Sequence, residues 1–350
     1  MKYILICSVF FIAFAGCKKD LYSGMDFVPP VFADSVYVKS EVLNDTIFTK
    51  SAWGMASYKD YIILLANIDD FLFQIYDKKT GLRVKSFGKL GRAPQEILPT
   101  NNFYVSETKC ILTSYSQSTR EILVFHLDSI IQNREHFLDK ISLNGCSDMT
   151  FFEVLPVHEN FLLYGGKCAV YPGGARYTLF SRQGQYLGAY DKYPISSTSD
   201  SIQKGSEWMD LGLTRTISPD GTKLAEATRV GGILEILEVT SQMKQTALKT
   251  FYQPHFYQDK EGQKYTPNTQ FGFYYLNSSS QAIYALSFNG SNNEMLPSCD
   301  LQTFDWSGNP VKKYKTDKPL LNICVDEKAK KAYALSQTPM HELTLISFDL

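Results

Sequence analysis

An apolar strand pattern recurs six times along the chain. Each copy starts after turn residues, enters a short apolar strand, turns, and runs into a second strand. The closest pair of copies reads Ile283-Tyr-Ala-Leu-Ser287 and Ala332-Tyr-Ala-Leu-Ser336. Equivalent positions fall 49, 51, 62, 59 and 49 residues apart, at Ile62, Ile111, Leu162, Leu224, Ile283 and Ala332. Repeats of this size, with about four strands each, are typical of a β-propeller in which every repeat forms one blade.

The stretch from Ile217 to Val239 shows the unit in detail. Pro219 and Gly221 favour a turn before the first strand, because proline presets φ and glycine tolerates a positive φ. Gly231 and Gly232 predict a two-residue hairpin between the strands. A lone hairpin is only marginally stable in water, so the unit must pack against others like it.

Partner strands follow the repeat at the distances that an antiparallel meander requires. The third strands are predicted at 73–76, 121–126, 177–180, 233–239 and 343–350, and fourth strands at 82–87, 185–190 and 311–314. The last copy is one strand short, and we predict that residues 36–42 or 46–50 supply the missing outer strand. This closure leaves no long free edge. We therefore expect an all-β fold, a single six-bladed propeller of four-stranded antiparallel blades over residues 35–350. A β-sandwich is the alternative, since regularly spaced strands suit it too.

Two segments depart from the strand pattern. Residues 128–139 predict a short helical turn or loop between blades, because Asp128-Ser129 can cap a helix and apolar residues follow. Residues 195–207 are polar and rich in serine, which predicts a long loop at one end of the ring.

The N-terminus has the order of features found in a secretion signal. Lys2 supplies a positive charge, residues 4–15 are apolar, and small residues precede Cys17. We therefore expect residues 1–16 to be a signal peptide that is removed. No later stretch is apolar and long enough to span a bilayer, so we expect an exported protein without a transmembrane helix.

The residues around Cys17 carry a resemblance to known anchors. Phe14-Ala-Gly-Cys17 resembles the lipobox of bacterial lipoproteins, although leucine is commoner than phenylalanine at its first position. Lys18-Lys19-Asp20 resembles the surface-export signal of Bacteroidetes lipoproteins. The resemblance implies acylation of Cys17, membrane lipid as a partner, and an outer-membrane lipoprotein facing the periplasm or the cell surface. Two or more acyl chains anchor a protein stably. We expect residues 17–34 to form the lipidated tether.

A second resemblance covers nearly all of the mature chain. Residues 87–96, FGKLGRAPQE, are similar to a loop that ends the first blade of the TolB-like six-bladed propeller lipoproteins of Bacteroidetes. Residues 270–290, 303–314 and 323–335 match further pieces in the same order. The resemblance implies a cell-envelope lipoprotein with a propeller body, and most members of that family have no assigned reaction or ligand.

Charge and cysteine usage exclude several classes of function. The chain has 35 basic and 36 acidic residues, so no overall field favours nucleic acid, and we predict none as a partner. Outside Cys7 and Cys17, five cysteines remain without a C-x-x-C or zinc spacing, which favours small buried thiols in strands over a metal site. Because five is an odd number, at least one of these thiols must be unpaired. They are Cys110, Cys146, Cys168, Cys299 and Cys324.

No catalytic or metal-binding motif stands out. The five histidines are dispersed, and neither H-E-x-x-H, G-x-S-x-G nor a Walker pattern occurs. His126, His136 and Asp139 could meet on one loop, yet solvated or capping roles suit them better. Adjacent Asp69 and Asp70 would point to opposite sides and not flank one bond. We expect no metal and no cofactor.

Five residues are candidates for a ligand-facing surface. Aromatic residues near predicted turns could stack on a sugar or peptide, although packing between blades is the alternative for each. Charged residues of the glycine-rich loop at 88–96 could face a ligand, or could satisfy local backbone and each other. The candidates are Trp53, Arg92, Glu96, Tyr171 and Trp208. We expect a non-enzymatic module that binds protein, peptide or glycan. The alternative is a glycan hydrolase or lyase with its active site at the channel mouth, since fold does not decide function.

Overall fold

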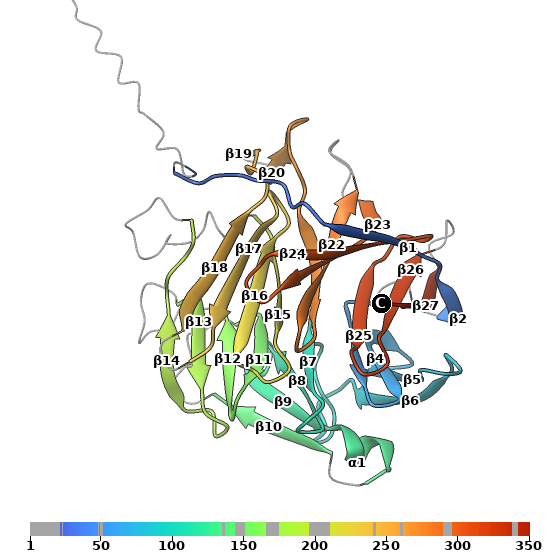
Figure 1. Ribbon diagram of the computed structural model, residues 1–350. Coiled ribbons are helices and arrows are strands. Elements are labelled where there is room, and N and C mark those ends of the chain that lie inside the picture. Colours follow the sequence, from blue (N-terminus) through green and yellow to red (C-terminus); the bar gives the residue numbers. More distant parts are fainter. Residues whose placement is uncertain are drawn as a thin grey trace, which may run out of the picture.

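The chain forms a closed ring of six β-sheets, seen in Figure 1. The computed structural model describes residues 22, 24–47, 49, 52–134, 137–143, 151–165, 175–195, 211–240, 243–259, 262–289, 296–337 and 342–350. Each sheet contains a four-stranded antiparallel meander and forms one blade, so the predicted fold class is confirmed. All six repeat positions found in the sequence lie in the second strand of their blades.

The first four blades follow the chain in order. Blade one contains β3 (Gly54–Tyr58), β4 (Tyr61–Ile68), β5 (Phe71–Asp77) and β6 (Arg83–Lys89). Blade two contains β7 (Phe103–Ser106), β8 (Ile111–Ser116), β9 (Glu121–His126) and β10 (Leu138–Ser142). Blade three contains β11 (Glu153–Val157), β12 (Asn160–Tyr164), β13 (Tyr177–Phe180) and β14 (Tyr186–Tyr190). Blade four contains β15 (Leu213–Ile217), β16 (Lys223–Thr228), β17 (Ile233–Glu238) and β18 (Lys244–Thr250).

The last two blades recruit strands from the N-terminal part of the chain. Blade five contains β21 (Phe273–Ser278), β22 (Ala282–Asn289), β23 (Leu296–Asp305) and β24 (Pro310–Thr316), and β1 (Asp34–Val38) adds a fifth, parallel strand beside β24. Blade six contains β25 (Asn322–Asp326), β26 (Lys331–Gln337) and β27 (Leu343–Asp349), with β2 (Glu41–Ile47) as its outer strand. A separate hairpin, β19 (Phe256–Asp259) and β20 (Gly262–Tyr265), lies between blades four and five in sequence.

The ring closes as predicted, but with a different strand boundary. The expected closing strand was residues 36–42 or residues 46–50, whereas the pairing with β27 runs from Glu41 to Ile47. Residues 36–38 instead pair with Tyr314 to Thr316 in blade five. The period-2 pattern of the sequence does not distinguish these partners, because both neighbouring blades offer an open outer edge.

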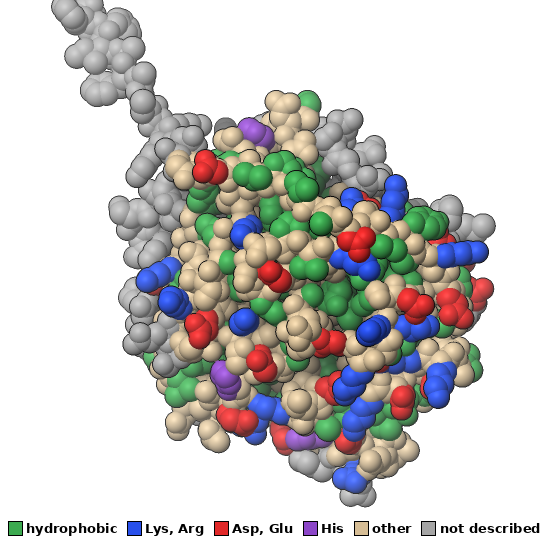
Figure 2. All heavy atoms as spheres, in the orientation of Figure 1, with side chains coloured by type: hydrophobic (Ala, Val, Ile, Leu, Met, Phe, Trp, Pro, Cys, Tyr) green, Lys and Arg blue, Asp and Glu red, His purple; other side chains and the backbone are tan. Residues whose placement is uncertain are grey.

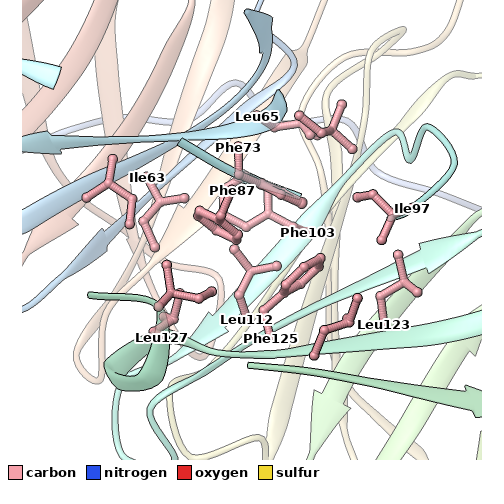
Figure 3. Close-up of a cluster of buried hydrophobic side chains, with 14 of the residues drawn as sticks. Ile63, Leu65, Phe73, Phe87, Ile97, Phe103, Leu112, Leu123, Phe125 and Leu127 are labelled. Atoms are coloured by element: carbon pink, nitrogen blue, oxygen red, sulfur yellow. The ribbon is translucent and has the colours of Figure 1, made fainter. Parts of the chain in front are cut away.

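A separate hydrophobic core lies between every two neighbouring blades. Between blades one and two, Phe73 stacks on Phe87 with ring centroids 4.9 Å apart and meets Phe103 and Phe125 edge to face (Figure 3). Equivalent clusters join every other neighbouring pair, including blades six and one. Both faces of each blade are therefore buried, which explains why the strands read as continuous apolar runs.

Two local predictions are corrected by the structure. The connection between β16 and β17 spans four residues, Arg229–Gly232, instead of the two-residue Gly-Gly hairpin, because Arg229 and Val230 bond to the segment before β15. The helical turn predicted at 128–139 is α1 (Leu127–Ile131), but it connects β9 to β10 within blade two instead of linking blades. Leu138 and Asp139 belong to β10.

The turn before β16 follows its predicted chemistry. Ser218 and Asp220 accept hydrogen bonds from the backbone N–H of Thr222, and Gly221 has a φ of +73°. A Cβ at position 221 would lie 2.7 Å from the backbone nitrogen of His158 in blade three. Glycine is therefore required both by conformation and by the close approach of the neighbouring blade.

Among the described cysteines, the prediction of small buried thiols in strands is confirmed for Cys324, whereas Cys110 lies in a turn and donates to the Glu107 carbonyl. Cys324 is buried in the core between blades six and one, while Cys110 and Cys299 are partly exposed, and all three are free thiols. Burial raises the pKa of the Cys324 thiol to about 12, so it stays protonated. Cys146 and Cys168 lie outside the described residues.

Candidate functional site

The two ends of the ring differ in their connections. In blades one to five, the first and second strands and the third and fourth strands are connected at one end, which we call the turn end; in blade six only the first and second strands are connected there. The connections between second and third strands and those between blades lie at the other end, which we call the loop end. Residues 90–102, 251–259 and 262–272 belong to the loop end, whereas most of the loop predicted at residues 195–207 lies outside the described residues. Ligand-binding residues are concentrated on such loops in proteins with a rigid scaffold.

The turn end is held together by ion pairs between blades. Lys59 of blade one lies 2.7 Å from Asp128 of blade two, and Lys109 of blade two lies 3.2 Å from Glu159 of blade three. Lys78 lies 2.5 Å from Asp326 of blade six, and both side chains are largely buried. These three ion pairs therefore join neighbouring blades at the turn end.

A pocket of about 230 Å³ opens at the loop end of blade two. The loop after β6 forms one wall and the strands of blade two form the other. Ile97 and Leu123 give the pocket an apolar floor, and charged side chains stand at its rim. Its lining consists of Gly91, Arg92, Glu96, Ile97, Leu98, Ser116, Thr119, Glu121, Leu123 and Lys140.

The wall of this pocket is fixed by its own hydrogen bonds. Gly91 N donates to the Ile97 carbonyl and Ile97 N donates to the Lys89 carbonyl, each at 2.9 Å. The Glu96 carboxylate folds back under the loop and accepts a hydrogen bond from Ala93 N at 3.0 Å. A Cβ at position 91 would lie 2.0 Å from Glu96 Oε2, so a larger residue would displace the Glu96 carboxylate from this position.

The charges around the pocket are only partly neutralised. Hydrogen bonds from Ala93 N and from Lys89 lower the pKa of Glu96, which therefore stays ionised. Lys140 Nζ donates to the Glu96 carbonyl at 2.7 Å. Within the described part of the chain, the Arg92 guanidinium and the Glu121 carboxylate form neither hydrogen bonds nor ion pairs. One positive and one negative group thus remain available to a ligand.

The axis of the ring is bridged by side chains of β21. Tyr275 of blade five contacts the backbone of Met55 in blade one, with its hydroxyl 3.2 Å from both N and O. Ser278 Oγ donates to the Ile217 carbonyl of blade four at 2.7 Å, and Asn277 Oδ1 accepts from Val325 N of blade six at 3.2 Å. Side chains of this one strand therefore form hydrogen bonds with the backbone of three other blades.

A buried charge cluster lies between blades three and four. Arg176 donates to both Glu226 and Glu235, and Arg215 donates to Glu226 at 2.9 Å and pairs with Glu153 at 2.7 Å. The Arg215 guanidinium also lies 3.4 Å from the centroid of the Tyr164 ring. Three carboxylates thus face two guanidinium groups in the interior.

Burial dominates the electrostatics of this cluster. Desolvation opposes the charged form of Arg176, but Glu226 and Glu235 outweigh it and raise the pKa of Arg176. Burial raises the pKa of Glu235, although Arg176 opposes this shift. Glu226 has no exposed side-chain surface. A substrate therefore cannot reach the carboxylate at the centre of the cluster, which suits a structural role better than catalysis.

The structure brings together two of the five predicted ligand-facing residues. Arg92 and Glu96 line the same pocket, but they do not pair with each other, because Lys89 takes the Glu96 carboxylate. Trp53 is 51% exposed at the start of β3, so it does not pack between blades, and it lies apart from that pocket. Tyr171 and Trp208 lie outside the described residues, as does Cys17.

Sequence reasoning missed Glu121, Lys140 and the buried charge cluster. A usable signal existed for the cluster, because Glu226 stands between Ala225 and Ala227 in a second strand of a blade. Both faces of a propeller blade are covered by neighbours, so a charge at that position must be buried and must have a partner. His126 and Asp139 do meet, with Nε2 2.7 Å from Oδ2, whereas His136 lies outside the described residues.

Metal and membrane-spanning features are not found in the described ranges. No group of three or more histidine, cysteine, aspartate or glutamate side chains there could hold a metal ion. No helix among the same residues has the length and hydropathy needed to cross a bilayer.

Comparison with known proteins identifies the family. The family model described as TolB-like 6-blade propeller-like matches residues 31–328. The chain belongs to the TolB-like propeller family. Comparison with curated proteins finds no match.

Solved structures share the fold of this TolB-like propeller at low sequence identity. A Bacteroides fragilis protein described as exported superposes with a TM-score of 0.56 at 11% identity, covering 92% of this chain and 98% of its own. A member of the DUF4221 family from Bacteroides vulgatus gives a TM-score of 0.51 at 9% identity, covering 89% and 98%. At this identity the similarity establishes the fold alone.

Proposed function

We propose that this TolB-like propeller is an exported envelope lipoprotein whose loop end binds a protein partner. Export is supported by the apolar N-terminal segment before Cys17 and by the structural similarity to a Bacteroides fragilis protein described as exported. Anchoring is supported by the lipobox-like residues 14–17. A protein held in this way samples partners in one compartment and needs no transmembrane helix.

The pocket on blade two carries the proposal of a binding function. Arg92 stands unpaired at its rim, Glu121 supplies the opposite charge, and Ile97 and Leu123 form an apolar floor. Binding sites combine an apolar surface with a few polar groups that fix orientation. A peptide segment that presents a carboxylate to Arg92 and an apolar side chain to the floor would complement all of these groups.

Binding is better supported than catalysis by where the charges lie. The buried carboxylates and guanidinium groups between blades three and four bond to one another in the interior, where Glu226 and Arg176 have no exposed side-chain surface. The charges of the pocket face solvent and remain available to a ligand. The enzyme hypothesis needs reactive groups that a substrate can touch, and the pocket has no histidine.

Site-specific cross-linking in intact envelopes tests the binding function. A photoreactive amino acid replaces the exposed Thr119 at the pocket or, as a control, Ala329 in a turn at the other end of the ring. We expect a discrete protein adduct from position 119 that disappears in an Arg92→Glu background and persists with Lys79→Glu, which reverses an exposed charge at the turn end. Equal adducts from positions 119 and 329, or an adduct insensitive to Arg92→Glu, would exclude the pocket as the binding site.

Fractionation tests the anchor separately. Replacing Cys17 with alanine should release the protein from membranes into the soluble fraction, because both acyl chains depend on that residue. Unchanged membrane retention of this variant would disprove the anchoring function.

A further inference from the structure

The segment that precedes the first strand is held firmly against the ring. Residues 22–33, which we call the strap, cross the loop end of blade four and the outer edge of blade five (Figure 1). Tyr22 and Met25 pack against the buried residues Val230 and Ile233 of blade four. Val28 N donates to the Thr250 carbonyl at 2.9 Å, and the Phe32 ring lies 5.6 Å from that of Phe304. β1 then pairs with β24 along its whole length.

The outer side of this segment is apolar. Val28 is 64% exposed and Val31 is 81% exposed, although the backbone around them is fixed. Tyr37 on β1 and Val311 on β24 are exposed beside them. Hydrophobic side chains gather in Figure 2 over the region that the strap occupies in Figure 1. These apolar side chains lie along one segment that also exposes Asp26 and Asp34, and apolar groups gathered on a surface indicate an interaction site.

Basic residues border this apolar surface. Tyr37 stands opposite Lys315 in the register between β1 and β24, and both side chains are exposed. Lys39 follows β1 and is also exposed. Neither lysine forms an ion pair with a described residue. Aromatic and lysine side chains next to apolar groups are typical of the interface between a membrane and water.

The chain outside the structure ends close to this surface. Only residues 18–21 separate Tyr22 from Cys17. Fully extended, this connection spans at most about 18 Å, since each residue adds no more than about 3.6 Å. An acylated Cys17 would therefore hold the loop end of blade four within that distance of the bilayer surface.

We propose that the exposed side of the strap, with Val28, Val31 and Tyr37, rests on the lipid surface and fixes the orientation of the ring. The inference rests on the proposed lipid anchor. Blades four and five then face the membrane with their outer rim. Blade two lies across the ring from blade five, so its pocket and the charge of Arg92 lie on the side of the ring far from the membrane, where a partner can reach them.

Cross-linking to lipid in reconstituted vesicles tests this orientation. The full-length lipidated protein is reconstituted into phosphatidylcholine vesicles that contain a traceable phospholipid, with a photoreactive amino acid at position 31 or at position 187. Leu187 on β14 of blade three is a matched control, because it is exposed and apolar but distant from the strap in sequence and sheet. We expect a several-fold greater yield of lipid adduct from position 31 than from position 187.

Vesicle flotation separates the two possible failures. If the protein floats with the vesicles and positions 31 and 187 give equal or no lipid adduct, the orientation is wrong while the anchor stands. If the protein does not float, the anchor and the orientation both fail. Val28→Asp, at a position where the side chain is 64% exposed, should reduce the adduct from position 31 without reducing flotation, and an unchanged yield would also contradict the orientation.

Discussion

Two groups of charged residues near the loop end contrast sharply in their surroundings. The cluster between blades three and four, with Arg176, Glu226 and Glu235, is buried and its members bond to one another. The charges at the pocket of blade two are exposed, and Arg92 has no partner in the described part of the chain. Charge buried within the ring can contribute to stability or to specificity of folding, whereas exposed and unpaired charge is free to recognise another molecule.

The contrast separates residues that hold the ring together from residues that the ring presents. Arg176 belongs to blade three while Glu226 and Glu235 belong to β16 and β17, so their pairing joins two blades. Arg92 is on a loop whose shape is set by Glu96, Ala93 and Lys89 without its help. Substitutions in the first group should therefore change stability, and substitutions in the second should change binding.

The largest expected effect is the loss of the buried cation. Arg176→Met leaves Glu226 and Glu235 without their shared partner in the interior. Removing one member of a buried ion pair costs about 3–5 kcal/mol of unfolding free energy. Urea denaturation of the soluble Cys17→Ala protein measures this loss, and Arg92→Met is the matched control, expected to fall within about 0.5 kcal/mol of the parent. Similar losses of unfolding free energy for both variants would show that the buried cluster and the pocket charges do not differ in their contribution to stability.

The loop that forms the pocket wall provides the next test, because Gly91 lies directly before the exposed Arg92. Gly91→Ala would place a Cβ 2.0 Å from Glu96 Oε2, which must leave its hydrogen bond to Ala93 N. The flexible Glu96 side chain can move away from the added methyl group, so the main cost is the lost hydrogen bond to the carboxylate, about 1–2 kcal/mol. We expect a loss in that range together with weaker cross-linking from position 119. Normal cross-linking with the same loss of stability would mean that the wall does not shape the binding site.

The fold was predictable from the sequence because every blade repeats the same strand pattern. The second strands could be placed from single residues such as Ile62 and Ile283, and the truncated last repeat required a closing strand. The extent of that strand was not predictable, because β1 and β2 are both short strands of mixed polar and apolar residues, and two adjacent blades compete for them. The edge that each one joins depends on the three-dimensional course of the chain.

The candidate site was only half predictable, for a related reason. Arg92 and Glu96 stood out as charged residues in a glycine-rich loop, but Glu121 and Lys140 read as ordinary strand residues. Their role arises from the packing of the loop after blade one against blade two. The segment predicted as a tether gave no sign that Phe32 would dock on Phe304 and fix its course.

The pH dependence of stability sharpens the description of the buried cluster. Burial raises the pKa of Glu235 above its ordinary value of 4.5. The folded state then binds a proton that the unfolded state has released, so this residue reduces stability as the pH rises from 4.5 toward the raised value. Glu235→Gln removes that decline while costing about 1.5–3 kcal/mol for the weakened hydrogen bond from Arg176. Urea titrations between mildly acidic and neutral pH should give a flatter profile for the variant. Parallel profiles would mean that Glu235 does not titrate in this range.

The smallest expected effect belongs to an exposed ion pair at the turn end. Its charged groups are paired, unlike Arg92, and are in contact with solvent, unlike Arg176. Hydrogen bonds from Lys59 and then Tyr58 lower the pKa of Asp128, which is about two-fifths exposed. A lowered pKa stabilises the fold above the ordinary carboxyl value of 3.8, and that contribution disappears as the pH falls through the lowered pKa. Asp128→Asn should therefore cost less than about 1 kcal/mol at neutral pH, less still in high salt, and nothing in strong acid. If Asp128→Asn lowers the unfolding free energy at neutral pH as much as Arg176→Met does, then having an ion-pair partner, and not being buried, determines how much a charged residue contributes to stability.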